Sequence, residues 1–158
     1  MNDPLFLFVG PSGSGKTTAV EELAKSYGYL TVQSYTTRPR RYENETGHTF
    51  ITDDQFDGLE NIVAYTVYNN YKYCTTKDQL DLVSTYVVDI TGIETLLHNY
   101  HTDRPIVIFY FDSTVTTRIN RMLDRHDSDT AIVGRLHNDE AFDWYSKLDH
   151  IVWHYVNI

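Results

Sequence analysis

A glycine-rich segment near the N-terminus has the residue types and spacing of a phosphate-binding loop. Residues 10–17 read GPSGSGKT and fit the pattern G-x-x-x-x-G-K-[ST]. Glycines let successive backbone N–H groups converge on phosphate oxygens, and the helix that follows adds its positive N-terminal end. In such a loop the lysine reaches the β- and γ-phosphates, and the threonine hydroxyl binds Mg²⁺. We therefore predict a site for ATP and Mg²⁺, with Thr17 as the metal ligand. The predicted ATP-binding residues are Ser12, Gly13, Ser14, Gly15, Lys16, Thr17 and Thr18.

The basic residues are clustered although the chain is acidic. Its 13 Lys and Arg residues face 22 Asp and Glu residues, which gives a formal net charge of −9. One arginine group lies at residues 38–41 and a second at residues 118–135. Local arginine groups in an acidic protein suit a small anion better than a polyanion. Clustering alone leaves open that these are solvated surface arginines.

Composition and charge exclude several classes of protein. The net charge argues against a protein that coats duplex nucleic acid. No apolar run reaches the length of about 18 residues that spans a membrane. The N-terminus lacks the basic start of a signal peptide. Cys74 is the single cysteine, so an internal disulfide is excluded and a cytoplasmic location is expected.

Hydrophobic periodicity predicts an α/β fold in one domain over residues 1–158. The expected architecture is a parallel-sheet P-loop NTPase core with helices on both faces of the sheet. Residues 34–75 interrupt the alternation and predict a small antiparallel β insert, and residues 121–136 predict a helical lid. The expected strands are 5–9, 29–33, 86–90, 106–111 and 151–153, with a hairpin over 62–75. The expected helices are 16–27, 53–56, 93–100, 114–125 and 129–147, and residues 34–48 are expected to be loop.

Ordered blocks along nearly the whole chain resemble guanylate kinases. Residues 34–41 (SYTTRPRR) and 47–56 (GHTFITDDQF) resemble the family's nucleotide-acceptor segment. No block after the phosphate loop is decisive alone, but the ordered set is specific. The other matching blocks are 73–76 (YCTT), 88–93 (VDITGI), 121–125 (RMLDR), 128–136 and 148–152 (LDHIV).

The resemblance implies a role for each matching residue. Ser34, Arg38 and Arg41 would hold the acceptor monophosphate, with His48 in place of the family's tyrosine. Thr75 and Asp89 would contact the acceptor base, and Tyr73 would stack near the acceptor nucleotide. Asp89 ends an expected strand, so an orienting role toward Mg²⁺ stays open for it. The catalytic residues implied are Lys16, Arg121, Arg125 and Arg135.

Four departures from the family pattern concern the acceptor side and the end of the chain. Ala64 stands where the family has a base-reading glutamate, and Val87 stands where it has an acidic residue. His48 replaces the phosphate-binding tyrosine, and the chain stops at Ile158 without the helix that usually follows. The loss of the base-reading glutamate removes a ligand for guanine, so other bases and deoxynucleotides stay open as acceptors. Arg40, Arg118 and the acidic stretch 43–45 are interpreted as solvated.

The expected function is an ATP-dependent nucleoside monophosphate kinase that acts on a (deoxy)nucleoside monophosphate, with GMP or dGMP first. The expected partners are small-molecule nucleotides, with no nucleic acid polymer and no membrane; the oligomeric state stays open. Two alternatives remain: a non-catalytic guanylate-kinase-like binding module, and a P-loop kinase for another phosphorylated small molecule.

Overall fold

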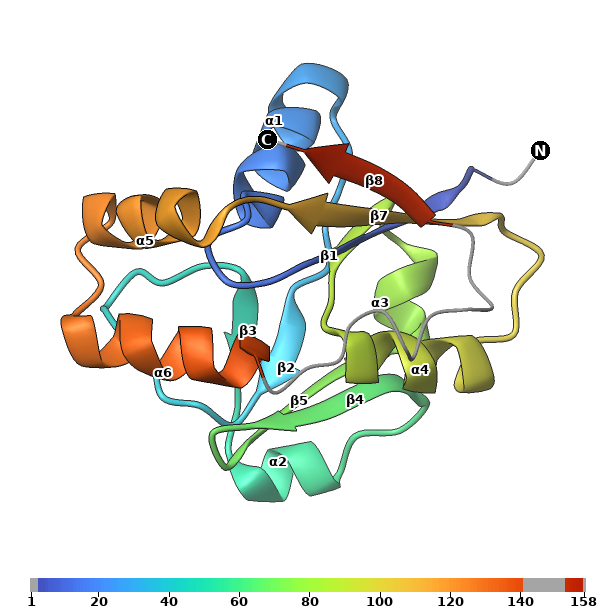
Figure 1. Cartoon of the computed structure of the whole chain (residues 1–158). Coiled ribbons are helices and arrows are strands. Elements are labelled where there is room, and N and C mark those ends of the chain that lie inside the picture. The colour runs from blue at the N-terminus through green and yellow to red at the C-terminus, as the bar shows by residue number, and fades with distance from the viewer. Residues whose placement is uncertain (1–2, 141–152, 158) are drawn as a thin grey trace.

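A parallel sheet with strand order β6-β1-β7-β8 lies at the centre of the computed structural model, which describes residues 3–140 and 153–157 (Figure 1). Its strands are β1 (Leu5–Val9), β6 (Thr85–Val87), β7 (Ile106–Asp112) and β8 (Trp153–Asn157). Strands β1 and β7 read as nearly continuous apolar runs because helices cover both faces of a parallel sheet. The predicted parallel-sheet α/β core is confirmed.

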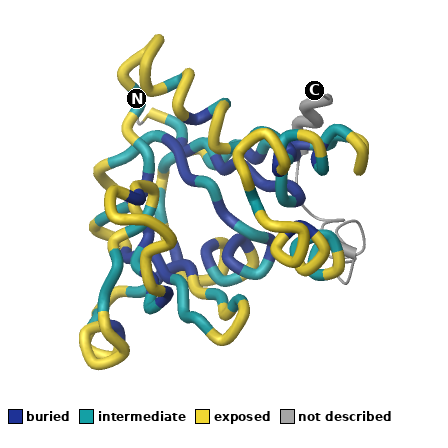
Figure 2. The backbone as a smooth tube through the Cα atoms, turned by 90° about the vertical axis from the view of Figure 1, so that its left-hand side faces the viewer, coloured by how far each residue is buried: buried dark blue, intermediate teal, exposed yellow. Residues whose placement is uncertain are grey.

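Helices pack on both faces of this sheet because alternate β1 side chains point to opposite sides. Leu5, Leu7 and Val9 form one core cluster with residues of α4 (Ile90–Asn99) and α3 (Lys77–Asp81). Phe8 forms the other cluster with Val20 of α1 (Lys16–Tyr27). Figure 2 shows the buried stretches gathered at the centre and the outer helix turns exposed.

A second sheet with strand order β3-β2-β5-β4 lies below the first in Figure 1. It contains β2 (Ser34–Thr36), β3 (His48–Phe50), β4 (Ile62–Tyr68) and β5 (Tyr71–Thr76), and α2 (Asp53–Asp57) follows β3. The predicted hairpin is present, with Asn69 and Asn70 in the left-handed conformation that tight hairpin turns need. The sheet is mixed rather than purely antiparallel, because β2 and β3 run parallel.

Two helices border the space between the sheets. Helix α5 (Val115–Asp124) follows β7, and α6 (Asp129–Glu140) turns back toward the second sheet (Figure 1). The predicted continuation of this last helix to residue 147 lies outside the described residues, as do residues 151–152 of the last predicted strand.

Two predicted strand boundaries were wrong for local reasons. The strand expected over residues 29–33 is only a single bridge, between Thr31 and Thr85. The strand starts instead at Ser34, inside the expected loop, where it pairs with both β3 and β5. The strand expected to reach residue 90 ends at Val87, because the Asp89 carboxylate caps α4 and the helix begins at once.

Candidate functional site

The loop between β1 and α1 has backbone geometry that only glycine accepts easily. Gly10 and Gly13 have φ angles of +149° and +76°. A Cβ on Gly10 would lie 2.3 Å from the Phe111 carbonyl oxygen, and one on Gly13 would lie 2.8 Å from the Arg118 carbonyl oxygen. The glycines of the motif therefore let the loop pack directly against the end of β7 and against α5.

Lys16 is folded back over this loop. Its Nζ donates to the carbonyl oxygens of Gly10 at 2.7 Å and Pro11 at 2.8 Å. Desolvation lowers the pKa of Lys16 to about 8, the nearby Arg118 also lowers it, and the Asp139 carboxylate opposes the shift. The ammonium group is thus held at the loop by acceptors that an anion could replace.

A cavity of about 850 Å³ adjoins the loop, and we call it the loop cavity. Thr17 and Thr18 line it from α1, and the three predicted lid arginines line it from the opposite side. Ser14, also predicted to bind ATP, is fully buried beneath the loop. The predicted residues lining the loop cavity are Ser12, Gly13, Gly15, Lys16, Thr17, Thr18, Arg121, Arg125 and Arg135.

A smaller cavity of about 260 Å³ lies between the two sheets, and we call it the inter-sheet cavity. Five of the predicted acceptor residues line it: Ser34, Arg41, His48, Tyr73 and Asp89. Sequence reasoning missed further residues that line it, among them Thr66, Tyr68, Tyr86, Asn138 and Asp139. Four residues, Ser12, Lys16, Arg41 and Arg135, line both cavities, so three cations stand where the cavities meet.

His48 and Ser34 face each other across the parallel pair β2–β3. The Ser34 hydroxyl lies 2.9 Å from His48 Nδ1, and the Tyr73 ring packs against the imidazole at 5.6 Å. Burial and the charge of Arg38 lower the pKa of His48, so the imidazole is neutral near pH 7. A neutral imidazole can still donate one hydrogen bond to an anion.

Arg38, also predicted to hold the acceptor phosphate, is buried, does not line the inter-sheet cavity and pairs with Glu45. The two side chains are 9% and 5% exposed, and their N–O distances are 2.7 and 3.2 Å. Glu45 also accepts from the Arg41 backbone N–H at 2.7 Å, so the pair fixes the loop that carries Arg41. The expectation of a solvated acidic stretch is wrong for Glu45, because this bidentate pair draws the carboxylate inside.

Arg40 is also held in place. It donates to the Glu45 carbonyl oxygen at 2.6 Å, and its guanidinium lies 4.3 Å from the centre of the Phe50 ring. Arg40 is exposed, as expected, and the Phe50 ring gives its guanidinium a stacking partner.

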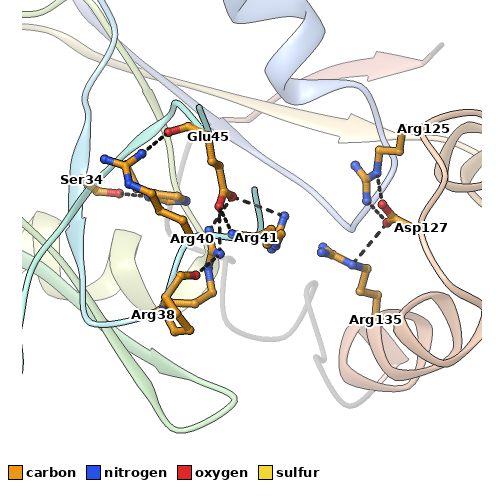
Figure 3. A network of polar contacts seen from close by, with 10 residues as sticks. Ser34, Arg38, Arg40, Arg41, Glu45, Arg125, Asp127 and Arg135 are labelled. Carbon is orange, nitrogen blue, oxygen red and sulfur yellow. Dashed lines mark hydrogen bonds and ion pairs between the residues drawn. The ribbon is translucent and has the colours of Figure 1, made fainter. Parts of the chain in front are cut away.

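A second group of charges faces the first from the lid side. Asp127 pairs with Arg125 at 2.9 Å and lies 3.6 Å from Arg135, while Arg121 donates to the Gly13 carbonyl oxygen at 3.3 Å. Figure 3 shows the two groups facing each other, with Arg41 and Arg135 on their inner sides. The chain thus brings together residues about 94 positions apart in sequence around one space for an anion.

Arg118 and Asp139 form a pair that clamps the phosphate-binding loop. Asp139 on α6 accepts from the Ser12 backbone N–H at 3.0 Å and pairs with Arg118. Arg118 Nε in turn donates to the Ser12 carbonyl oxygen at 2.8 Å. Arg118 is therefore buried, not solvated as expected. Helical spacing offered a signal, because Arg118 precedes Arg121 by one turn and Asp139 follows Arg135 by one turn.

Two predicted base-contacting residues occupy different surroundings. Asp89 lines the inter-sheet cavity and accepts from the Gly92 N–H at 2.6 Å, and its burial raises its pKa. Thr75 is fully buried, and its hydroxyl donates to the Tyr86 hydroxyl at 2.9 Å. Ala64 is 1% exposed and belongs to the core cluster that also contains Tyr86.

Within the described residues no group of three or more His, Cys, Asp or Glu side chains could hold a metal ion. Thr17 is exposed at the loop cavity, where its hydroxyl fits one ligand position of a Mg²⁺ ion that also binds phosphate oxygens and water. No helix in the described part of the chain is long and apolar enough to cross a membrane.

Several known proteins are similar to this chain in sequence. The model of a family described as "AAA domain" matches residues 5–89. A guanylate kinase of Legionella pneumophila (strain Paris) is 27% identical, over 94% of this chain and 77% of that protein. A guanylate kinase of Coxiella burnetii (strain RSA 493 / Nine Mile phase I) is 28% identical, over 82% of this chain and 68% of that protein.

Solved structures share the fold. The crystal structure of a guanylate kinase from Anaplasma phagocytophilum has a TM-score of 0.58 at 17% identity and covers 99% of this chain and 77% of that one. A sugar kinase from Janibacter sp. HTCC2649 has a TM-score of 0.50 at 14% identity and covers 98% of this chain and 85% of that one. The phosphate-binding loop lies inside the matched family region, and guanylate kinases are relatives over most of the length. The chain therefore belongs to the AAA domain family, and guanylate kinases are its homologues over most of its length.

Proposed function

We propose that this protein is an ATP- and Mg²⁺-dependent nucleoside monophosphate kinase with GMP or dGMP as its first acceptors. The observation that carries the proposal is the junction of the two cavities at Lys16, Arg41 and Arg135. A donor phosphate in the loop cavity and an acceptor phosphate in the inter-sheet cavity would meet among these cations. The relatives named guanylate kinase support this choice of acceptor.

In this proposal, the residues that line the two cavities bind different substrates. Residues 34–75 act as the acceptor-binding insert and residues 121–136 as the lid. In the loop cavity the backbone amides and Lys16 would hold the triphosphate, and the Thr17 hydroxyl would hold a Mg²⁺ ion that supplies positive charge beside the phosphates. In the inter-sheet cavity Ser34, His48 and Arg41 hold the acceptor phosphate. Arg38 acts through Arg41, whose loop it fixes.

Phosphoryl transfer breaks the bond between the γ-phosphorus and the β,γ-bridging oxygen and forms a bond to an acceptor phosphate oxygen. ADP keeps the electron pair of the broken bond. The reaction needs little covalent help from the protein, so alignment and charge neutralisation dominate. Arg121, Arg125 and Arg135 line the loop cavity opposite the loop and would stabilise the charge on the transferring group.

The test is ADP formation from ATP and Mg²⁺ with each of the eight common ribo- and deoxynucleoside monophosphates. We expect turnover with GMP or dGMP and none in Lys16→Met, which removes the ammonium group. Bound ATP without ADP formation from any acceptor would contradict the kinase and leave the binding-module alternative. Turnover with a phosphorylated sugar and with no nucleotide would support the other alternative.

A further inference from the structure

The hydroxyl of Tyr86 links the buried Thr75 to the inter-sheet cavity. Thr75 has no exposed surface, and the cavity lining does not include it. Its hydroxyl donates to the Tyr86 hydroxyl at 2.9 Å, and Tyr86 does line the cavity. Because the phenol oxygen accepts this bond, its own O–H remains available to donate.

Asp89 supplies the complementary group three residues further along the chain. Its carboxylate accepts from the Gly92 N–H and from the Thr66 side chain. A carboxylate has about four acceptor positions, so it can accept a further hydrogen bond from a ligand. Burial raises the pKa of Tyr86, and the nearby Asp89 charge raises it further, so the phenol stays a neutral donor.

The side chain at position 64 cannot form a hydrogen bond with a ligand. Ala64 pairs with Thr75 across β4 and β5 and is buried in the same core cluster as Tyr86. A methyl group offers a ligand no hydrogen bond. Tyr86 belongs to the same core cluster, and its hydroxyl accepts a hydrogen bond from Thr75 on β5 of the other sheet.

We propose that Tyr86 is a specificity-determining residue of the acceptor site, paired with Asp89. Tyr86 donates to an acceptor atom on the edge of the nucleobase, and Asp89 accepts from an adjacent N–H of the same edge. This inference rests on the proposed kinase function. It selects acceptors whose base presents an acceptor atom and an N–H side by side in that orientation.

The experiment compares kcat/KM for all eight nucleoside monophosphates, at saturating ATP, in the wild type and Tyr86→Phe. Loss of one directed hydrogen bond should lower kcat/KM for the best acceptor about 10-fold. The kcat/KM values for poorer acceptors should fall less, so the ratio of each of these values to that for the best acceptor rises. The KM for ATP should stay constant. Thr75→Val, which removes the donor to the phenol, should shift the ratio in the same direction by a smaller amount.

Tyr100→Phe is the matched control, because Tyr100 is buried and its hydroxyl donates to Asp81 at 2.8 Å, outside both cavities. It should leave the acceptor ratios unchanged. Unchanged ratios in folded Tyr86→Phe would overturn the role of Tyr86 while the kinase function stands. If Tyr86→Phe does not fold, Thr75→Val decides by the same criterion. A wild type inactive on all eight acceptors would overturn the proposed function and this inference together.

Discussion

The charge of Lys16 depends on its surroundings. Its pKa of about 8 in the free loop means that it loses its proton above that pH, whereas a bound triphosphate favours the charged form. ATP binding should therefore require proton uptake above pH 8, and the Kd for ATP should rise about tenfold per pH unit there. Below pH 7 this contribution should be constant.

Calorimetry in two buffers of different ionisation enthalpy measures this proton uptake. At pH 9 the apparent binding enthalpy should differ between the buffers by the uptake of close to one proton, and at pH 6.5 by little. A Kd that stays constant between pH 7 and 9.5 would show that Lys16 keeps its charge in the free loop.

A second prediction for a single residue concerns the contribution of Glu45 to the free energy of unfolding. In Glu45→Gln the buried Arg38 guanidinium loses its counter-charge, and breaking such a pair costs about 3 kcal/mol. Burial alone would raise the pKa of Glu45, but the hydrogen bonds from Arg38 and Arg41 lower it overall. The stabilisation is therefore present above the unfolded value of about 4.5 and is lost as the pH falls through the lower folded value.

Urea unfolding of Glu45→Gln at pH 7 and pH 4 tests both parts of this prediction. The variant should be less stable than the wild type at pH 7, and the difference should shrink at pH 4. Glu43→Gln is the control, because Glu43 is an exposed residue of the same loop. Equal stability of the two variants at pH 7 would mean that the Arg38–Glu45 pair contributes nothing net.

Helix α6 connects the phosphate-binding loop to the second sheet. Asp139 accepts from the Ser12 N–H, and one residue earlier Asn138 donates to the Tyr68 hydroxyl at 2.9 Å. The helix thus contacts the loop and the hairpin at once. A bound triphosphate would contact the loop amides and Lys16. The Asp139 carboxylate is close to the same groups, so its negative charge opposes triphosphate binding.

Asp139→Asn keeps the size of the side chain and removes its charge. We expect the Kd for ATP to fall about 5-fold, since the lost repulsion at partly screened distance is of the order of 1 kcal/mol. The variant should also unfold at lower urea, because Arg118 loses its counter-charge. Asp129→Asn, an exposed residue at the start of the same helix, should change neither value appreciably. Weaker ATP binding in Asp139→Asn would show that the carboxylate positions the loop for ATP instead of opposing it.

Elements with strong local signals were predictable from sequence, and contacts between elements were not. The apolar run of β1, the glycine loop and the period of α1 lie in consecutive residues, so one window of sequence contains them. The burial of Glu45 and Arg118 depends on partners that only the tertiary fold brings close, and an acidic loop looks solvated without them. Tyr86 was missed because a tyrosine in an apolar strand is indistinguishable from a core residue until its partner Thr75 is known.

Across the whole molecule, the two cavities share Lys16, Arg41 and Arg135, so we expect the two proposed substrates not to bind independently. Ser34 lines only the inter-sheet cavity and Thr17 only the loop cavity, whereas Arg135 lines both. The second sheet contributes Ser34, α1 contributes Thr17, and α6 contributes Arg135, which lines both cavities. Substitutions at these three positions should therefore have three different kinetic signatures.

Arg135→Ala should raise the KM of both substrates and lower kcat about 100-fold, because one preorganised donor to the transferring group is lost. Ser34→Ala should raise the acceptor KM alone, and Thr17→Ala should weaken ATP and Mg²⁺ binding alone. Steady-state kinetics with both substrates varied separates the three patterns. An Arg135→Ala enzyme with only one altered KM would place this arginine in a single cavity and would remove the junction as the point of phosphoryl transfer.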